Sequence, residues 1–210
     1  MIDMKIALIG YGKMGHMIES VALEREHEIV ARIDAGDKFD LNGADVAIEF
    51  TTPTTAEANI RAAWQQGVPV VCGSTGWKAQ ELMEEDRRIH NKTMLVWKSN
   101  FSIGVNIFFD LNKELAQKMA AQPQYHPSIT EIHHIHKLDK PSGTAKTIAE
   151  QIGTDVAIES IREGEVPGTH TVTWDSEEDT IVITHIAKGR RGFALGAVIA
   201  AEQLVIHNSY

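Results

Sequence analysis

The sequence predicts an α/β fold, in which a Rossmann-type doubly wound parallel sheet is joined to a second α+β domain with an open mixed or antiparallel sheet. An apolar run at residues 4–9 leads directly into GYGKMG and then into a helical pattern. Short apolar runs and helical patterns alternate as far as residue 104, which is typical of a parallel sheet. Beyond it, runs of alternating polarity at residues 169–175 and 180–187 are typical of antiparallel strands.

The first domain is predicted to hold strands at residues 4–9, 27–33, 46–50, 68–72 and 94–96. Helices are predicted directly after the glycine loop, at residues 56–64 and at residues 81–90. Between Asp34 and the next strand there are only about ten residues, which is too few for a full crossover helix.

The second domain is predicted to begin with a long helix at residues 105–119, followed by a strand at 129–136 and a helix from Thr144. A last helix at 193–206 returns to the first domain. We therefore expect residues 1–104 plus 190–210 to form the first domain, and residues 105–189 the second. The flat face of the second sheet, bearing Val172 or Thr171 and Ile181 or Ile183, is the expected subunit interface.

The composition limits the classes of partner. The 210 residues carry a formal net charge of −9, which argues against non-specific nucleic-acid binding. No apolar run approaches the length of a membrane span, and the first residues lead directly into a strand, which leaves no room for a signal peptide. The single cysteine, Cys72, lies in an apolar run, so we expect it in the core of a protein of the reducing cytoplasm.

The glycine loop lies between a strand and a helix, as a dinucleotide fingerprint requires. Gly10 permits the tight turn, Gly12 leaves room for the pyrophosphate, and Gly15 lets helix and strand pack closely. A glycine-rich turn without a ligand is the alternative. The predicted cofactor contacts cover the whole loop: Gly10, Tyr11, Gly12, Lys13, Met14 and Gly15.

Asp34 ends the second predicted strand, about twenty residues past the glycines, where a carboxylate binds the ribose 2′-hydroxyl. Because a carboxylate repels a 2′-phosphate, NADH is the expected cofactor. Lys13 could still help a 2′-phosphate, so NADPH stays possible. The alternative for Asp34 is a simple turn residue at a strand end.

The stretch EIHHIHKLDKPSGTA at residues 131–145 concentrates the chemistry of the chain. Ser142 or Thr144 can cap the helix that follows, and the free N–H groups of Ser142, Gly143 and Thr144 would form an anion site. Imidazoles move protons near neutral pH, and Lys137 adds a positive charge or a second acid. This set of groups suits a small anionic substrate that is protonated while its negative groups are held.

Two alternatives compete with that interpretation. The histidine-rich strand could be a solvated face. His133, His134 and His136 could also be metal ligands, but no cysteine lies nearby and Glu131 is the only close carboxylate on the N-terminal side. No metal is therefore predicted.

The 131–145 stretch resembles the signature of the 4-hydroxy-tetrahydrodipicolinate reductase family of the lysine pathway. The resemblance covers nearly the whole chain and includes GYGKMG at 10–15, VCGSTGW at 71–77, SNFSIGVN at 99–106 and GRRGFALGAV at 189–198. It implies a nucleotide-binding N-terminal domain, a substrate domain inserted before the last helix, and a homotetramer built on the second sheet. The chain departs from the usual member in being shorter, mostly between Asp34 and Asp45.

The resemblance also implies roles. His133 resembles the proton donor and acceptor, Lys137 the second acid, and His134 a group that binds a substrate carboxylate. The remaining expected substrate contacts are the backbone of Gly143 and Thr144 and the side chain of Arg190. The further cofactor contacts that it implies, at strand ends where a doubly wound sheet binds ligands, are Asp34, Gly73, Ser74, Thr75, Ser99, Asn100, Phe101 and Ser102.

The implied activity is the reduction of the cyclic imine dicarboxylate 4-hydroxy-tetrahydrodipicolinate to tetrahydrodipicolinate with NAD(P)H, in diaminopimelate and lysine biosynthesis. One alternative is another NAD-dependent oxidoreductase acting on an amino or keto acid. The other is a non-catalytic NAD-sensing protein of the same fold.

Overall fold

The computed structural model describes residues 3–153 and 156–209. The chain divides into two compact units. The first unit holds the residues up to Ser102 and those from Arg191 onward, and the second unit is Ile103–Arg190. Within the described residues, no helix is both long and apolar enough to span a membrane.

The first unit contains a five-stranded sheet of order β2-β1-β3-β4-β5, in which every neighbouring pair is parallel. The predicted doubly wound parallel sheet is thereby confirmed. The strands β1, β3 and β4 are buried almost throughout because helices cover both faces of the sheet. The strands are β1 (Lys5–Ile9), β2 (Glu28–Ile33), β3 (Val46–Glu49), β4 (Val70–Cys72) and β5 (Leu95–Trp97).

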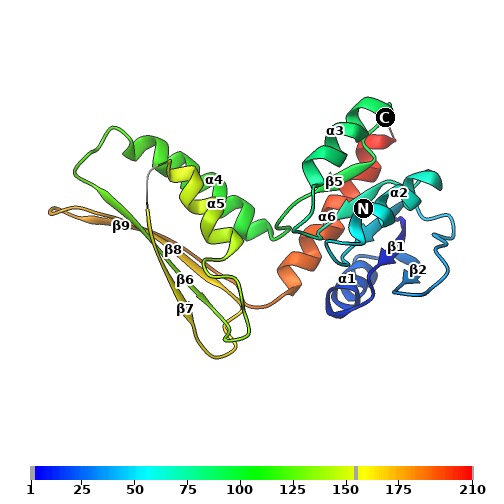
Figure 1. The fold of residues 1–210 in the computed structure, drawn as a ribbon, viewed down its shortest axis with the longest axis horizontal. Helices are drawn as coiled ribbons and strands as arrows, with labels where there is room; N and C mark the ends of the chain where they lie inside the picture. Colours follow the sequence, from blue (N-terminus) through cyan, green and yellow to red (C-terminus); the bar gives the residue numbers. More distant parts are fainter. Residues whose placement is uncertain (1–2, 154–155, 210) are drawn as a thin grey trace. The chain divides into compact units, whose positions relative to one another are not determined.

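Two helices pack on each face of this sheet (Figure 1). α1 (Lys13–Glu24) and α6 (Arg191–Asn208) cover one face, and α2 (Ala56–Gln65) and α3 (Ala79–Ile89) cover the other. Residues 34–45, all of them described, contain no helix, as the short connection predicted. Cys72 is fully buried in the core, also as predicted.

α6 lies very close to the chain after β5. A Cβ placed on buried Gly196 would lie 1.6 Å from the carbonyl oxygen of Phe101, so only glycine fits there.

We expect Gly196→Ala to lower the free energy of unfolding by roughly 2–4 kcal/mol, because helix or backbone must shift to admit the methyl group. Chemical denaturation of the two proteins measures the difference. Gly192→Ala on the same helix is the matched control, since the nearest atom to its Cβ would be 3.8 Å away. Equal stability of the two variants would contradict the packing described.

The second unit contains a four-stranded mixed sheet of order β7-β6-β8-β9. β6 runs parallel to β7 and antiparallel to β8, and β8 runs antiparallel to β9. The strands are β6 (His126–His133), β7 (Ala157–Arg162), β8 (Thr169–Asp175) and β9 (Thr180–Ile186). β7 has no counterpart among the strands predicted from the sequence.

β6 lies three residues earlier than predicted at each end. It can include Pro127 because that residue pairs only with Trp174 of β8, and the pairing with β7 begins at Ser128. The strand ends at His133, so His134 and His136 lie in the turn that follows. The three histidines therefore do not share one strand.

One face of the second sheet is covered by α4 (Ile103–Met119) and α5 (Gly143–Ile152), as Figure 1 shows. Their contact forms a core around Phe108, Ile129, Ile148 and Val172. α5 begins at Gly143, one residue before the predicted start.

The expected interface residues lie mostly on the wrong face. Val172 and Ile183 belong to the core under the helices, and Ile181 pairs with buried Trp174 on that same side. Of the four residues named, Thr171 alone lies on the opposite face. The strict alternation of a strand decides this, and the sequence alone left it open. The register also places four apolar residues on the opposite face: Ile132, Ile161, Val182 and Ile186.

Candidate active site

The glycine loop of the first unit leaves an open space at a helix start. Gly10 has a φ of +92°, and a Cβ on it would lie 2.3 Å from the carbonyl oxygen of Phe50. A Cβ on Gly15 would lie 2.5 Å from the carbonyl oxygen of Gly10. Gly12 is the N-cap of α1, and nothing lies within 4 Å of a Cβ built there. Gly10 and Gly15 thus serve packing, whereas the space beside Gly12 is open, as the predicted pyrophosphate contact requires.

The other side chains of the loop point in different directions. The Tyr11 hydroxyl donates a hydrogen bond to Glu19, which also pairs with Arg32. The Arg32 guanidinium lies 5.8 Å from the centre of the Tyr11 ring. Lys13 is exposed and Met14 is half-buried. The Glu19–Arg32 pair therefore holds the Tyr11 side chain of the loop in place, a contact that the sequence did not indicate.

Asp34 directly follows β2 and lies beside the glycine loop, because the Gly10 N–H donates to the carbonyl oxygen of Ile33 at 2.8 Å. Its side chain is in an exposed turn, where one carboxylate oxygen accepts from the N–H of Ala35 at 2.9 Å. The position of Asp34 agrees with the expected ribose contact. Its hydrogen bond within the turn also fits the alternative, in which Asp34 is a simple turn residue at a strand end.

The loop after β4 is shaped by one aromatic ring. A Cβ on Gly73 would fall 2.2 Å from the ring of Phe50. Ser74 is buried, and its hydroxyl oxygen accepts from the N–H of Thr51 at 2.9 Å. Thr75 is exposed. Ser74 thus ties two loops at the carboxyl ends of the strands, while the Thr75 side chain is open to solvent.

The loop after β5 is partly a core segment. Phe101 is buried in the core that α1 and α6 form with the sheet, so a ligand could reach only its backbone. Asn100 accepts the N–H of Ser102 at 2.8 Å through its side-chain oxygen, and Ser99 is exposed.

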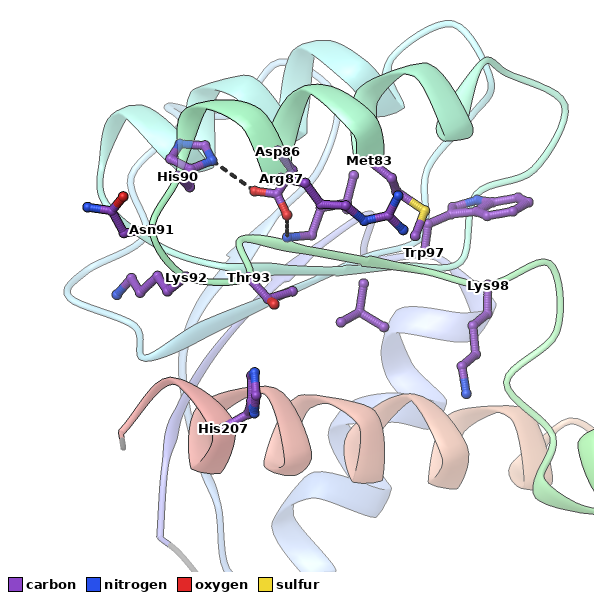
Figure 2. A pocket seen from close by; sticks show the side chains of 12 residues that line it. Met83, Asp86, Arg87, His90, Asn91, Lys92, Thr93, Trp97, Lys98 and His207 are labelled. Carbon is purple, nitrogen blue, oxygen red and sulfur yellow. Dashed lines mark hydrogen bonds and ion pairs between the residues drawn. The ribbon is translucent and has the colours of Figure 1, made fainter.

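A separate pocket of about 520 Å³ lies along β5, the edge strand of the first sheet (Figure 2). Buried Asp86 accepts the backbone N–H groups of Met94 and Leu95 at 3.1–3.2 Å and pairs with His90 at 2.8 Å. None of the predicted cofactor or substrate residues is among those that line this pocket. Five basic residues line it: Arg87, His90, Lys92, Lys98 and His207.

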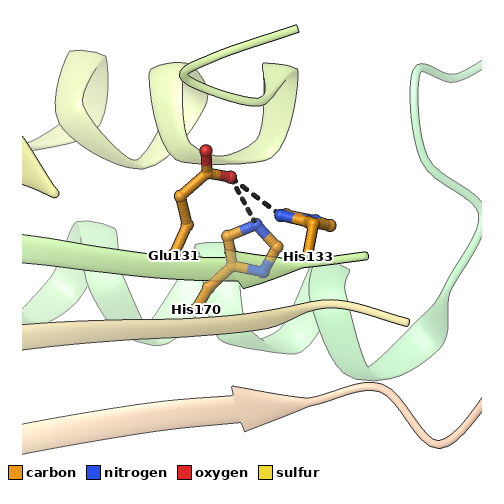
Figure 3. A group of neighbouring side chains, drawn as sticks. All are labelled: Glu131, His133 and His170. Atoms are coloured by element: carbon orange, nitrogen blue, oxygen red, sulfur yellow. Dashed lines mark ion pairs between the residues drawn. The ribbon is translucent and has the colours of Figure 1, made fainter. Parts of the chain in front are cut away.

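The second unit brings one carboxylate and two imidazoles together in its interior (Figure 3). The Oε2 atom of Glu131 lies 3.0 Å from Nδ1 of His133 and 3.9 Å from Nε2 of His170. At 3.0 Å the first two atoms are within ion-pair distance, and the pair is charged on both sides only when His133 is protonated. The ring N–H does not point at the oxygen, so this contact is electrostatic rather than a well-formed hydrogen bond. The two imidazole rings meet edge to face, with centroids 5.0 Å apart.

Glu131 is fully buried and is held by groups from three other segments. Its Oε1 atom accepts from the N–H of Ser142 and from the guanidinium of Arg162, both at 3.0 Å. Burial raises the pKa of Glu131, but the polar groups of Ser142, Ser160 and Arg162 outweigh burial and bring the pKa to about 2. Glu131 is therefore a permanent negative charge at neutral pH.

The two buried imidazoles have pKa values below that of free histidine, which favours their neutral forms. Burial lowers the pKa of His133, and the charge of Glu131 opposes this effect. Burial lowers the pKa of His170 to about 4, and the charge of His133 acts in the same direction. At neutral pH, His170 is thus neutral, and its Nε2 lies 3.3 Å from the hydroxyl oxygen of Ser142.

Lys137 and the start of α5 already hold a carboxylate of the protein itself. The Lys137 ammonium lies 2.7 Å from Oδ1 of Asp139. Burial raises the pKa of Asp139, but Lys137 and the backbone amides of Asp139 and Gly143 outweigh it and lower the pKa. Lys137 and the Gly143 amide are two of the groups that the sequence predicted to act on the substrate.

Ser142 is the N-cap of α5, as one of the two predicted candidates, and its hydroxyl oxygen accepts from the N–H of Ala145 at 3.2 Å. The first intrahelical hydrogen bond runs from Lys146 to Ser142. Gly143 and Thr144 therefore have amides without an acceptor inside the helix, which is the arrangement of an anion site.

The remaining predicted substrate residues are less constrained. His134 is half-buried, with its ring centre 5.9 Å from that of exposed His136. Nε2 of His136 lies 2.9 Å from Glu165. Arg190 is exposed and is the last residue of the second unit.

Sequence reasoning gave no role to Glu131, Arg162 or His170. Glu131 could have been found, because it lies two residues before His133 and so shares its side of the strand. Arg162 and His170 come from β7 and β8, and nothing near them in the sequence indicates the site.

The same three groups test the metal alternative. One ligand atom from each of Glu131, His133 and His170 lies within 4.8 Å of the others. This is a different set from the three histidines considered in the sequence. The Arg162 guanidinium already occupies Oε1 of Glu131, and a cation there opposes a divalent metal.

A parallel sheet with an open glycine loop, joined to an α+β unit with a histidine–carboxylate cluster, defines a two-unit protein of the Rossmann-type dinucleotide-binding class. The family model described as "Dihydrodipicolinate reductase, N-terminus" matches residues 4–101. The model described as "Dihydrodipicolinate reductase, C-terminus" matches residues 104–209. The chain belongs to the dihydrodipicolinate reductase family.

Individual proteins agree with the family models. A 4-hydroxy-tetrahydrodipicolinate reductase from Christiangramia forsetii is 45% identical, over 96% of this chain and 92% of the relative. One from Thermosipho africanus is 36% identical, over 95% and 90%. The structure of a dipicolinate-bound dihydrodipicolinate reductase from Paenisporosarcina sp. TG-14 has a TM-score of 0.80 and 22% identity, over 98% of this chain and 96% of that one. At that identity it supports the fold.

Proposed function

We propose that this protein reduces 4-hydroxy-tetrahydrodipicolinate to tetrahydrodipicolinate with NAD(P)H in diaminopimelate and lysine biosynthesis. The observation that carries the proposal is the arrangement at residues 131–144. There, buried His133 lies beside an ionised Glu131, and Lys137 and the start of α5 hold a carboxylate. A ring that bears two carboxylates and must gain a proton fits these groups.

In this proposal the first unit binds the nicotinamide cofactor, and the open space at Gly12 before α1 suits its pyrophosphate. Loss of the 4-hydroxyl group as water leaves the ring carbon that carried it conjugated with the imine, and the reduced nicotinamide would supply the hydride to that carbon. Asp139 leaves both Lys137 and the Gly143 amide; the amides of Gly143 and Thr144 then hold one carboxylate of the substrate, and Lys137 binds a second negative group. His133 and Lys137 then stabilise the electrons that move toward the ring nitrogen and supply the proton. His134 and Arg190 complete the proposed substrate contacts.

A substrate panel tests the activity. Wild-type protein with NADH is expected to oxidise the cofactor with the freshly made cyclic imine dicarboxylate and not with open-chain amino or oxo acids. Turnover of an oxo acid alone would favour a different amino- or keto-acid oxidoreductase. Bound NADH without turnover of any compound would favour an NAD-sensing protein.

Within this function, NADH is the proposed preferred cofactor, because Asp34 lies beside the glycine loop. We expect Asp34→Ser to shift the ratio of kcat/KM for NADH over NADPH toward NADPH by about tenfold, since a carboxylate repels a 2′-phosphate. Asp40→Asn, on the same connection and paired with Lys38, is the control that leaves the ratio unchanged. A wild-type protein that strongly prefers NADPH would show that Lys13 outweighs Asp34.

A homotetramer built on the open face of the second sheet, acting in the cytoplasm, completes the proposal. The apolar residues on that face are Ile132, Ile161, Val182 and Ile186, and burying such a face removes it from water. Light scattering tests the assembly. A tetramer in the wild type and smaller species in Val182→Glu would support it, and a monomeric wild type would contradict it.

A further inference from the structure

We propose that Glu131 is a positioning residue, which fixes the distance between the proton donor and the carboxylate-binding helix start and favours the protonated form of the donor. This inference rests on the proposed function, because it gives Glu131 a part in the same reaction.

Glu131 connects the two halves of the site directly. One of its oxygens, Oε1, accepts the N–H of Ser142, the N-cap of α5, at 3.0 Å. The other, Oε2, lies 3.0 Å from Nδ1 of His133. A single rigid carboxylate therefore spans from the imidazole to the helix that offers the Gly143 and Thr144 amides. Because Glu131 is fully buried between them, neither end can move without breaking one of these contacts.

Arg162 extends this connection to the loop that carries Lys137. Its guanidinium donates to Oε1 of Glu131 at 3.0 Å, to the carbonyl oxygen of Asp139 at 2.6 Å and to that of Lys137 at 3.3 Å. Arg162 thus anchors the turn backbone to the same carboxylate. Glu131 contacts the proposed acid His133 directly. It is connected to the turn of Lys137 through Arg162 and to the anion-binding amides through Ser142.

His170 completes the arrangement as a neutral partner. The oxygen of Ser142 already accepts from Ala145, so its hydroxyl hydrogen is available to Nε2 of His170 at 3.3 Å. The His170 ring packs edge to face against His133 and leaves the His133 ring little freedom to rotate. A histidine that stayed charged here would instead repel His133.

The electrostatic part follows from the groups around His133. Glu131 faces it from β6, His170 from β8, Arg162 from β7, and Lys137 and Asp139 from the turn. Burial has the largest effect and lowers the pKa of His133; the charge of Glu131 opposes it, Lys137 and Arg162 act with burial, and Asp139 acts with Glu131. A proton donor is active only below its own pKa, so the rate falls as pH rises through that value. Removing the charge of Glu131 lowers the pKa of His133 and moves this fall to lower pH.

The experiment compares pH profiles of kcat and kcat/KM for the wild type, Glu131→Gln and the control Glu165→Gln. Glu165 is also paired with a histidine, His136 at 2.9 Å, but this pair is exposed. For Glu131→Gln we expect kcat at alkaline pH to fall at least about tenfold and the falling limb to move down by about one pH unit. The control is expected to keep the wild-type profile. A Glu131→Gln profile that matches the wild type in height and midpoint would overturn the proposal.

If Glu131→Gln fails to fold because Arg162 is left buried and unpaired, the double variant Glu131→Gln/Arg162→Met removes both charges and keeps the volume. Its falling limb is still expected at lower pH, since Glu131 acts on His133 more strongly than Arg162 does. A double variant with the wild-type profile would equally reject the role.

An NMR titration of the His133 ring, assigned by the loss of its signal in His133→Ala, gives a readout that needs no turnover. A lower His133 pKa in Glu131→Gln supports the electrostatic part, and an unchanged value contradicts it. A wild type that turns over no cyclic imine would reject the proposed function, while this titration would still decide the effect of Glu131 on His133.

Discussion

Replacement of His133 by alanine is expected to lower the rate of imine reduction by about a hundredfold or more at neutral pH, while NADH still binds. The variant loses the imidazole that we propose as proton donor. It leaves the glycine loop and Asp34 untouched, because these belong to the other unit of the chain. Single-turnover measurements of NADH oxidation, with cofactor binding followed by nicotinamide fluorescence, separate the two effects.

The matched control is His136→Ala. His136 lies three residues further on and also pairs with a glutamate, but its side chain is exposed. It is expected to react at nearly the wild-type rate. Circular dichroism of both variants checks the fold, since His133 is packed against His170. A folded His133→Ala protein with wild-type turnover would remove His133 from the mechanism.

Replacement of Lys137 by methionine is expected to reduce the rate by about the same factor and to raise KM for the dicarboxylate as well. Methionine keeps most of the stem and removes the ammonium, which lies 2.7 Å from Asp139 in the structure. The effect on KM distinguishes Lys137 from His133, because the ammonium can hold a carboxylate in the ground state and His133 is proposed to act mainly in proton transfer.

Lys146→Met serves as the control for Lys137→Met. Lys146 is exposed on α5, one turn past the helix start, and is expected to keep the wild-type kcat and KM. An unchanged KM together with an unchanged kcat in Lys137→Met would show that the ammonium contacts only Asp139.

The first unit could be predicted from the sequence almost strand by strand, because its signals are local. Buried parallel strands are short apolar runs, and GYGKMG lies between one of them and a helix. Even there, the functions of individual residues depended on distant contacts. The Phe50 ring leaves no room for a side chain at Gly73, and the buried Ser74 hydroxyl oxygen accepts a hydrogen bond from Thr51.

The second unit was less predictable because its strands pair across long separations. β7 has a half-buried, mixed pattern without a clear period, and it was missed. Because β7 was not predicted, Arg162 could not be placed near the site. The predicted strand ran to residue 136 and so included His134 and His136, which lie beyond the end of β6. The choice between Val172 and Thr171 for the open face required the register with β6 and β9.

We propose above all that residues 133–144 bind the ring dicarboxylate opposite the nicotinamide. A crystal structure with NADH and a planar ring dicarboxylate such as dipicolinate tests it most directly. We expect one carboxylate on the Gly143 and Thr144 amides, Lys137 released from Asp139, and the nicotinamide ring against the bound analogue. A dicarboxylate bound elsewhere, or a nicotinamide far from residues 133–144 in that complex, would contradict it.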